Sequence, residues 1–165
     1  MQDALARRAG EPGALLPILH DVQDALGYVP ADQVPAIAEA LNLSRAEVHG
    51  VVTYYHHFRS TPAAPHVLQI CRAEACQSMG ADALMAHAEL RLGCSSAQGH
   101  SGVAATSSMS NDGAFTLEPV FCLGLCASSP ALMLDGELHA RMTTRAFDTL
   151  IAEVAAVADT AEHAA

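Results

Sequence analysis

The sequence predicts an α/β protein in two parts, an N-terminal helical bundle over residues 1–60 and a small α/β domain over residues 66–158. Apolar residues recur with helical spacing through the first part, whereas the second part has the pattern strand, helix, strand, hairpin, helix. Between the two parts, residues 60–65 (STPAAP) contain two prolines and no strong periodicity, which is typical of a linker. The chain therefore combines an all-helical part with a mixed part.

The first part begins with residues 1–12, which are expected to form a loose, arginine-containing lead-in. From Gly13 onward, apolar residues at positions i, i+4, i+7 and i+11 predict an amphipathic helix that ends at Gly27. The residues of this stripe are Leu15, Leu19, Val22 and Leu26. A second short helix is predicted to begin at Asp32.

The third helix has the clearest start signal. Ser44 and Glu47 form a capping box, in which each side chain satisfies a backbone donor of the other residue. The helix is expected to run towards Phe58 and to bury one face. The residues of that face are Val48, Val51, Val52 and Tyr55. Tyr54 and Tyr55 are therefore expected to be core and contact residues.

The second part begins with a predicted strand over residues 66–71, followed by a helix over residues 79–92. Residues 95–113 are rich in Ser and Gly, so they predict a loop, with a short strand over residues 103–105. A further strand is predicted over residues 115–121, where apolar and polar residues alternate.

A β-hairpin is predicted from residues 131–134 and 138–141, which flank the dipeptide Asp135-Gly136. Both central residues of a type I′ turn need a positive φ, and Asp and Gly tolerate it well. A threonine then caps a last helix, whose tail after Val157 is expected to fray. The order of these elements favours a small α/β sandwich.

The composition excludes several classes of protein. Of the 165 residues, 51% are apolar and 16% are charged, which is not the composition of a wholly disordered chain. The chain has 8 basic residues, all arginine, and 18 acidic ones, so its formal net charge is -10. This charge argues against sequence-independent binding of nucleic acid. No stretch approaches the roughly 20 apolar residues that cross a bilayer, and the N-terminus lacks the apolar region of a secretory signal. A cytoplasmic protein with reduced cysteines is therefore expected.

Four of the five cysteines form two pairs, and each pair follows a predicted strand. Cys71 and Cys76 have the spacing C-x4-C, and Cys122 and Cys126 have the spacing C-x3-C. Two such pairs on two strand-end loops can form a cage of four thiolates, a ligand set used by zinc and by iron–sulfur clusters. Cys94 stands apart from both pairs and is expected not to be a ligand.

Other interpretations of the cysteine pairs remain open from their spacing. Structural zinc sites favour the tighter C-x2-C spacing, so a zinc-stabilised interaction module is an alternative but not the first choice. A reducing compartment disfavours disulfides, and a thioredoxin-type dithiol would need C-x-x-C. Four buried structural cysteines are the plainest alternative. The spacings of bacterial and plant-type ferredoxins do not match, because the two pairs lie far apart in the sequence.

Residues 71–81 (CRAEACQSMGA) and 122–137 (CLGLCASSPALMLDGE) resemble the two cluster loops of the thioredoxin-like 2Fe-2S ferredoxin family. The segments LLPILHDVQDALGYVP and ALNLSRAEVHGVVTYYHHF resemble its helical extension, so the resemblance runs from about residue 13 to about residue 155. It implies a thioredoxin-like domain that holds one 2Fe-2S cluster. By this resemblance, the cluster ligands are Cys71, Cys76, Cys122 and Cys126.

The family includes the small flavoprotein-module subunit of respiratory NADH dehydrogenase and the gamma subunit of NAD-dependent formate dehydrogenases. Residues 72–75 (RAEA) and Gln77 resemble the formate dehydrogenase subunit more closely. This implies an electron-transfer subunit, not an enzyme by itself, in a cytoplasmic, molybdenum-containing formate dehydrogenase. Its partners would be a flavin-bearing NAD-reactive subunit and a catalytic subunit with molybdenum and iron–sulfur centres. The alternative is the equivalent subunit of respiratory NADH dehydrogenase or of an NAD-reducing hydrogenase.

The surroundings of the cysteine loops indicate how a cluster would be tuned. Gly124 has no Cβ and is expected to let a backbone N–H approach a sulfur. A helix that begins near Ser78 or Met79 would point its positive end towards the first loop. Arg72 could neutralise charge beside the cluster, but Glu74 opposes it, so no net effect is assigned to the two.

The sequence holds no other recognisable catalytic device. It contains no G-x-G-x-x-G motif, no P-loop motif and no nucleophile–base pair. Adjacent helical positions point about 100° apart, so His56 and His57 are not expected to share a metal ion. The sequence therefore predicts a carrier of electrons that depends on other chains for its substrate chemistry.

Overall fold

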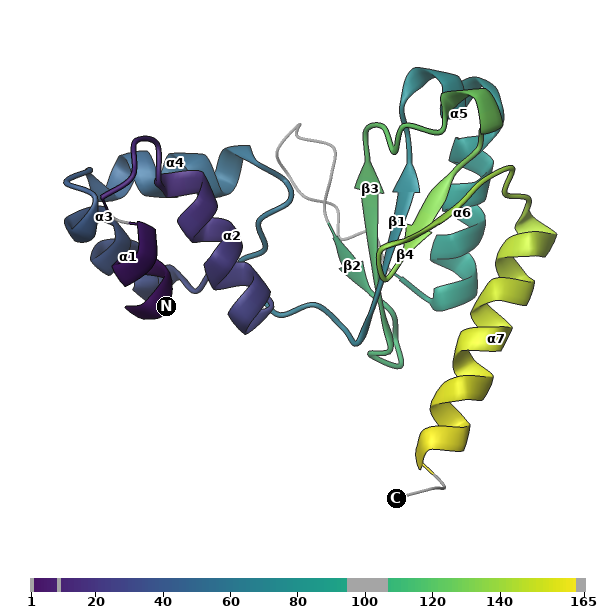
Figure 1. The fold of residues 1–165 in the computed structure, drawn as a ribbon. Coiled ribbons are helices and arrows are strands. Elements are labelled where there is room, and N and C mark those ends of the chain that lie inside the picture. The colour runs from purple at the N-terminus through teal and green to yellow at the C-terminus, as the bar shows by residue number, and fades with distance from the viewer. Residues whose placement is uncertain (1, 9, 95–106, 163–165) are drawn as a thin grey trace. The chain divides into compact units, whose positions relative to one another are not determined.

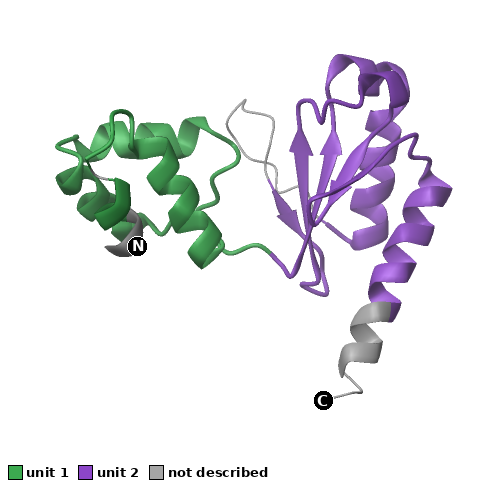
Figure 2. Cartoon of the chain, viewed as in Figure 1, with its two compact units in different colours: residues 1–63 green, residues 64–165 purple. Residues whose placement is uncertain are grey.

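The computed structural model describes residues 2–8, 10–94 and 107–162. The chain divides into two compact units, residues 1–63 and residues 64–165 (Figure 2). The boundary lies inside the proline-containing segment STPAAP. Each unit has its own apolar core.

The described part of the first unit is all-helical (Figure 1). Its elements are α1 (Gln2–Arg8), α2 (Leu15–Leu26), the 3-10 turn η1 (Ala31–Gln33), α3 (Val34–Ala40) and α4 (Arg45–Tyr54). Their apolar faces meet in one core, so the helices stabilise one another by burying these faces. The fully buried members of the core include Ile18, Leu19, Val22, Ile37 and Val48.

Local chemistry sets the end of α2 and the start of α4. Gly27 adopts a φ of 82°, and its N–H donates to the Gln23 carbonyl oxygen at 2.7 Å, so α2 ends where the sequence predicts. At α4, Ser44 Oγ accepts from the Glu47 N–H at 3.2 Å, while the Ser44 N–H donates to Glu47 Oε2 at 2.8 Å. The predicted capping box is therefore confirmed.

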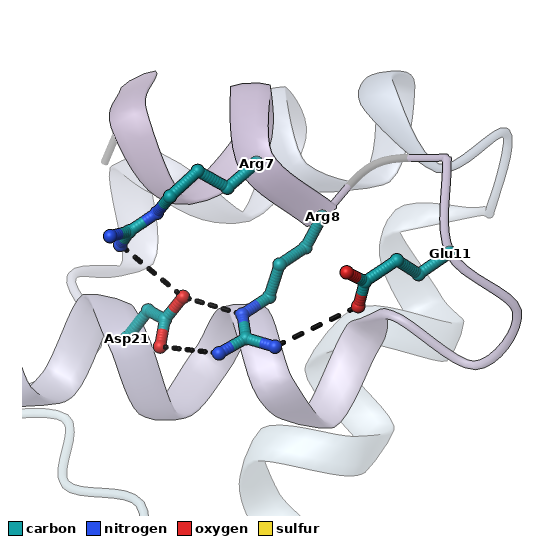
Figure 3. Close-up of polar contacts among 4 residues, drawn as sticks. All are labelled: Arg7, Arg8, Glu11 and Asp21. Atoms are coloured by element: carbon teal, nitrogen blue, oxygen red, sulfur yellow. Dashed lines mark hydrogen bonds and ion pairs between the residues drawn. The ribbon is translucent and has the colours of Figure 1, made fainter.

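The helix α1 contradicts the loose lead-in predicted for residues 1–12. Figure 3 shows the reason: Arg8 Nε donates to Asp21 Oδ2 at 2.7 Å, and Arg7 Nη2 lies 3.6 Å from the same oxygen. Arg8 also pairs with Glu11 at 3.7 Å. The hydrogen bond from Arg8 holds the pKa of Asp21 below its usual range. These ion pairs connect α1 to α2 across 13 residues of sequence, so no local pattern predicts them.

The aromatic residues at the end of α4 are exposed, contrary to the prediction that they belong to the core. α4 ends at Tyr54, and Tyr55 has an extended backbone with φ −87° and ψ 107°. Their side chains are 74% and 43% exposed, whereas Phe58 is buried in the helical core. The chain leaves the helix before the apolar pattern ends, so Phe58 rather than Tyr55 closes this core.

The described strands of the second unit form one sheet with the order β2-β3-β1-β4-β5 (Figure 1). They are β1 (His66–Cys71), β2 (Ser108–Met109), β3 (Phe115–Val120), β4 (Leu132–Leu134) and β5 (Glu137–His139). β1 and β3 are parallel, and the other neighbouring strands are antiparallel. Because β1 and β3 are parallel, the segments that follow them leave the sheet at the same edge.

Helices complete the second unit. They are α5 (Glu74–Ser78), α6 (Ala81–Leu92), the 3-10 turn η2 (Cys126–Ser128) and α7 (Thr144–Glu162). α6 and α7 bury apolar side chains against one face of the sheet (Figure 1). This core includes Leu68, Ile70, Leu84, Leu117, Leu132, Phe147 and Ile151. Among the described residues, no helix has both the length and the apolar character needed to span a membrane.

The predicted hairpin is confirmed. Asp135 and Gly136 connect β4 to β5 with φ values of 50° and 88°, as a turn with two positive φ angles requires. The hairpin extends the sheet on the β4 side of β1, so it completes the sheet that carries the cysteine segments.

Four other predictions for this unit need correction or lie outside the described residues. The helix predicted over residues 79–92 starts later, at Ala81, and is preceded by the separate helix α5, because Gly80 has a φ of 96° that interrupts the helical path. β2 lies in the predicted loop of residues 95–113 and is formed by pairing with β3. The short strand predicted over residues 103–105 lies outside the described residues. α7 continues beyond the point where fraying is expected.

Candidate functional site

Two cysteine-bearing segments meet at the carboxyl end of the parallel strands (Figure 1). The first contains Cys71, the last residue of β1, and Cys76, which lies in α5. The second contains Cys122, two residues after β3, and Cys126, the first residue of η2. α5 and η2 are in contact, so the fold brings the two predicted cysteine pairs to one edge of the sheet.

Backbone hydrogen bonds hold the first segment in place. The Cys71 N–H donates to the Ala131 carbonyl oxygen at 3.0 Å, and the Arg72 N–H donates to the Val120 carbonyl oxygen at 2.7 Å. Cys71 and Cys76 are each 2% exposed. They form a small buried cluster whose members are Cys71, Cys76, Ala81 and Ala131. The first cysteine pair therefore lies in apolar packing.

The second cysteine pair is exposed, so the interpretation as four buried structural cysteines is wrong for half of the set. Cys122 Sγ and Cys126 Sγ lie 3.8 Å apart. Two thiolates bound at about 2.3 Å to one tetrahedral metal lie about 3.8 Å apart, so this spacing suits a shared metal atom. Cys122 adopts a φ of 115°, a region that L-residues rarely occupy. The Gly124 N–H donates to Cys122 Sγ at 3.4 Å, as predicted, but a Cβ at Gly124 would meet no atom within 4 Å, so the positive φ of 79° rather than the missing Cβ is what favours glycine here.

Ser129 connects the two segments, although no sequence motif singles it out. The Cys76 thiol donates to Ser129 Oγ across 3.5 Å. Ser129 Oγ in turn donates to the Cys126 carbonyl oxygen at 2.8 Å. Its place three residues after the last cysteine is the one signal that could have drawn attention to it.

The thiols influence one another electrostatically. Burial acts to raise the pKa of Cys76, but hydrogen bonds with Ser129, with Cys71 and with the Ala131 backbone outweigh it, so the pKa is lower than usual. The pKa of Cys126 is raised by its hydrogen bond with Cys122 and by the negative charges of Cys122, Cys76 and Cys71. The four sulfurs are thus close enough for their charges to repel, and a bound cation would relieve this repulsion.

The donor set fits a cluster with two metal atoms. A 2Fe-2S core is held by four cysteine thiolates that are shared between its two irons. Here the thiols lie as two pairs, one formed by Cys122 and Cys126 and one by Cys71 and Cys76. Two pairs of sulfur ligands at one sheet edge therefore suit two iron atoms.

The charged residues beside the first segment are Arg72 and Glu74. Arg72 Nη2 lies 2.8 Å from Asp82 Oδ1, on α6, so an exposed ion pair compensates the charge of the arginine, for which the sequence assigned no net effect. Glu74 is exposed in the first turn of α5. With a length of five residues, α5 contributes little helix dipole beside Cys76.

Cys94 and the two adjacent histidines lie elsewhere in the structure. Cys94 is buried in the core between the sheet and its helices, and burial raises its pKa. Its thiol donates weakly to the Ser108 carbonyl oxygen across 3.9 Å. His56 and His57 belong to the first unit, where the His57 ring packs against His20 with 4.9 Å between ring centroids.

Comparison with known proteins agrees with these features. The Thioredoxin-like 2Fe-2S ferredoxin family matches residues 1–155. An NADH-quinone oxidoreductase subunit from Pseudomonas aeruginosa is 34% identical over 126 residues, which make up 76% of this chain and 70% of the relative. The subunit of the same name from Escherichia coli is 32% identical over 138 residues, 84% of this chain and 77% of the relative.

Among solved structures, an NAD+-reducing NiFe hydrogenase in the air-oxidized state has a similar fold. The TM-score is 0.66 at 23% identity, and the likeness covers 91% of this chain. The chain spans 24% of that hydrogenase chain, so the likeness concerns one portion of a larger protein.

The family match extends over nearly the whole chain, and the structure supplies two pairs of thiols at one sheet edge. The family match favours an iron–sulfur cluster over the zinc alternative, because the family carries an iron–sulfur cluster. The chain belongs to the thioredoxin-like 2Fe-2S ferredoxin family, and its cofactor is one 2Fe-2S cluster.

Proposed function

We propose that the chain is the electron-transfer subunit of an NAD-linked oxidoreductase complex of the NADH dehydrogenase or NAD-reducing hydrogenase type. Its 2Fe-2S cluster is held by Cys71, Cys76, Cys122 and Cys126. The observation that carries this proposal is the meeting of the two cysteine pairs at the end of β1 and β3. Family membership and the names of the relatives support it.

The buried and the exposed cysteine pair have different roles in holding the cluster. When bound, the cluster takes up and releases one electron at a time. Cys71 and Cys76 are buried, so they anchor it to the packed interior of the unit. Cys122 and Cys126 are exposed, so they bring it to the surface, where a partner can exchange electrons with it. Phe121, which precedes Cys122 in the sequence, and Met79, which follows α5, are 60% and 62% exposed and offer apolar contact area on the two cysteine segments.

The partner in this proposal is a flavin-bearing, NAD-reactive subunit. The sequence contains no recognised nucleotide-binding motif, so the proposal assigns the NAD chemistry to another subunit. All five cysteines are free thiols, which agrees with a cytoplasmic setting where thiols stay reduced.

Two complexes are candidates for the one that contains this chain. The relatives above are named as subunits of NADH-quinone oxidoreductase, which favours this alternative over the formate dehydrogenase that was the first expectation from the sequence. A formate dehydrogenase with a molybdenum-containing subunit remains a second candidate, favoured by residues 72–75 and Gln77.

Purification of the native complex tests the proposal. A tagged chain should co-purify with a flavin-bearing subunit, and the preparation should reduce an artificial electron acceptor with NADH. Molybdenum in the preparation, together with formate-dependent reduction of NAD+, would assign the chain to formate dehydrogenase instead. A chain that carries one zinc ion and no acid-labile sulfide, or that captures no flavoprotein, would overturn the proposal.

A further inference from the structure

The hydroxyl of Ser129 lies between the two cysteine segments and bonds to both. It accepts from the Cys76 thiol across 3.5 Å and donates to the Cys126 carbonyl oxygen at 2.8 Å. Cys76 is almost fully buried and Ser129 is half-buried, so the contact between them is partly shielded from water. Shielding makes a hydrogen bond to a charged sulfur stronger than it would be at the surface.

The direction of this hydrogen bond must change when a cluster is bound. An iron-bound thiolate has no proton, so Cys76 can then only accept a hydrogen bond. The Ser129 hydroxyl has one proton and two acceptors within reach, the Cys76 sulfur and the Cys126 carbonyl oxygen. Reduction adds one negative charge to the cluster and its sulfur ligands, which strengthens a hydrogen bond donated to sulfur.

The two cysteine pairs differ in the source of their hydrogen bonds. Cys122 accepts from a backbone donor, the Gly124 N–H at 3.4 Å. Cys76 contacts a side-chain hydroxyl, which a single substitution can remove. Hydrogen bonds to ligand sulfurs are among the factors that set the potential of an iron–sulfur cluster.

We propose that Ser129 is a positioning residue that donates a hydrogen bond to the Cys76 sulfur and thereby raises the reduction potential of the cluster. The inference rests on the proposed role of Cys76 as a ligand. It assigns to Ser129 a preferential stabilisation of the reduced cluster, in which the hydroxyl proton is donated to the Cys76 sulfur in place of the Cys126 carbonyl oxygen.

A redox titration of the full chain, reconstituted with iron and sulfide and followed by electron paramagnetic resonance, tests the inference. Ser129→Ala should shift the equilibrium between oxidised and reduced cluster at least threefold towards the oxidised form. At 59 mV per tenfold change for one electron, this is a shift of about 28 mV to a more negative potential.

Ser128→Ala is the matched control, since the Ser128 carbonyl oxygen accepts from the Arg141 N–H and, among the described contacts, its hydroxyl reaches no sulfur. It should change the potential by less than a third of the Ser129→Ala shift. An unchanged potential in Ser129→Ala, or an equal shift in Ser128→Ala, would overturn the inference.

A second pair of variants covers the case in which Ser129→Ala fails to hold a cluster. Ser129→Thr and Ser129→Val have nearly the same shape and differ in a hydroxyl. Thr should keep the potential close to that of the unaltered chain and Val should lower it, whereas equal potentials would contradict the proposed hydrogen bond. Iron and sulfide analysis separates this outcome from failure of the ligand assignment, because full cluster content in Cys76→Ala would refute the proposed ligand set itself.

Discussion

The buried and the exposed cysteine pair reach the same sheet edge by different physical means. Cys71 and Cys76 are held by packing, because each is 2% exposed and belongs to a small apolar cluster. Cys122 and Cys126 are exposed, and their loop is shaped by its backbone instead, with φ values of 115° at Cys122 and 79° at Gly124. The buried pair therefore depends on its neighbours, and the exposed pair depends on its own loop conformation.

Removal of a single proposed ligand, from either cysteine pair, should have the largest effect on cluster content. The buried and the exposed pair should not differ in this respect. Cys76→Ala and Cys122→Ala each leave three thiolates, so both are expected to lose at least nine-tenths of the iron and sulfide, measured after reconstitution. Cys94→Ala is the control and should retain the full visible spectrum, because Cys94 lies in the separate core beneath the sheet. A bleached Cys94→Ala variant alongside a coloured Cys122→Ala variant would contradict the ligand assignment.

Alkylation of the cluster-free chain should reveal most directly that the two cysteine pairs differ in solvent exposure. Cys122 and Cys126 are exposed and should react with iodoacetamide at least tenfold faster than the buried Cys71 and Cys76, as peptide mass spectrometry can measure. The raised pKa of Cys126 means that its thiolate fraction, and hence its labelling rate, should continue to increase up to a more alkaline pH than that of a thiol with the usual pKa. Equal labelling of both pairs in the folded chain would show that the buried pair is accessible in solution.

Substitution of Gly124 should weaken the exposed pair alone. A methyl group at this position meets no atom within 4 Å, but a φ of 79° costs a residue with a Cβ about 1 kcal/mol. Gly124→Ala should therefore speed loss of the cluster to a chelator about threefold to fivefold, measured by the decay of visible absorbance.

Gly136→Ala provides the matched control for this effect. Gly136 has a similar φ of 88° and the same open surroundings, but it lies in the hairpin between β4 and β5. It should lower the stability of the unit by a comparable amount without a faster cluster loss. Equal acceleration in both variants would mean that general destabilisation, not the cysteine loop, controls the loss.

Neutralisation of Arg72 should have the smallest effect. The side chain follows Cys71 in sequence, but its charge is paired with Asp82 at 2.8 Å on an exposed surface, where such pairs contribute about 0–1 kcal/mol. Arg72→Gln is expected to shift the reduction potential by less than the Ser129→Ala variant does. A larger shift would show that the arginine charge reaches the cluster despite its partner.

Short-range chemistry was enough to predict several elements. The capping box of Ser44 and Glu47 and the turn of Asp135 and Gly136 involve residues at most three positions apart. Their conformations follow from side-chain hydrogen bonds and from tolerance of positive φ, so their residue types reveal them. By the same logic, the four paired cysteines and their position after two strands were visible in the sequence.

The elements that sequence patterns did not predict depend on partners far along the chain. α1 forms ion pairs with Asp21, 13 residues from Arg8, and the two-residue strand β2 exists because it pairs with β3. The exposure of Tyr54 and Tyr55 reflects where the chain leaves α4, which the helical period of the apolar residues does not encode.

The sequence alone determined the kind of protein, through the resemblance that the family match confirmed, and it predicted a two-part organisation and the four cysteines proposed as ligands. Only the tertiary structure decided how the cysteines differ. The parallel pairing of β1 with β3 brings both segments to one edge, packing buries Cys71 and Cys76, and a fold across 53 residues of sequence sets Ser129 beside Cys76. Burial and contact between distant segments are properties of the packed chain, because residue type and spacing specify which side chains are available but not which neighbours surround them.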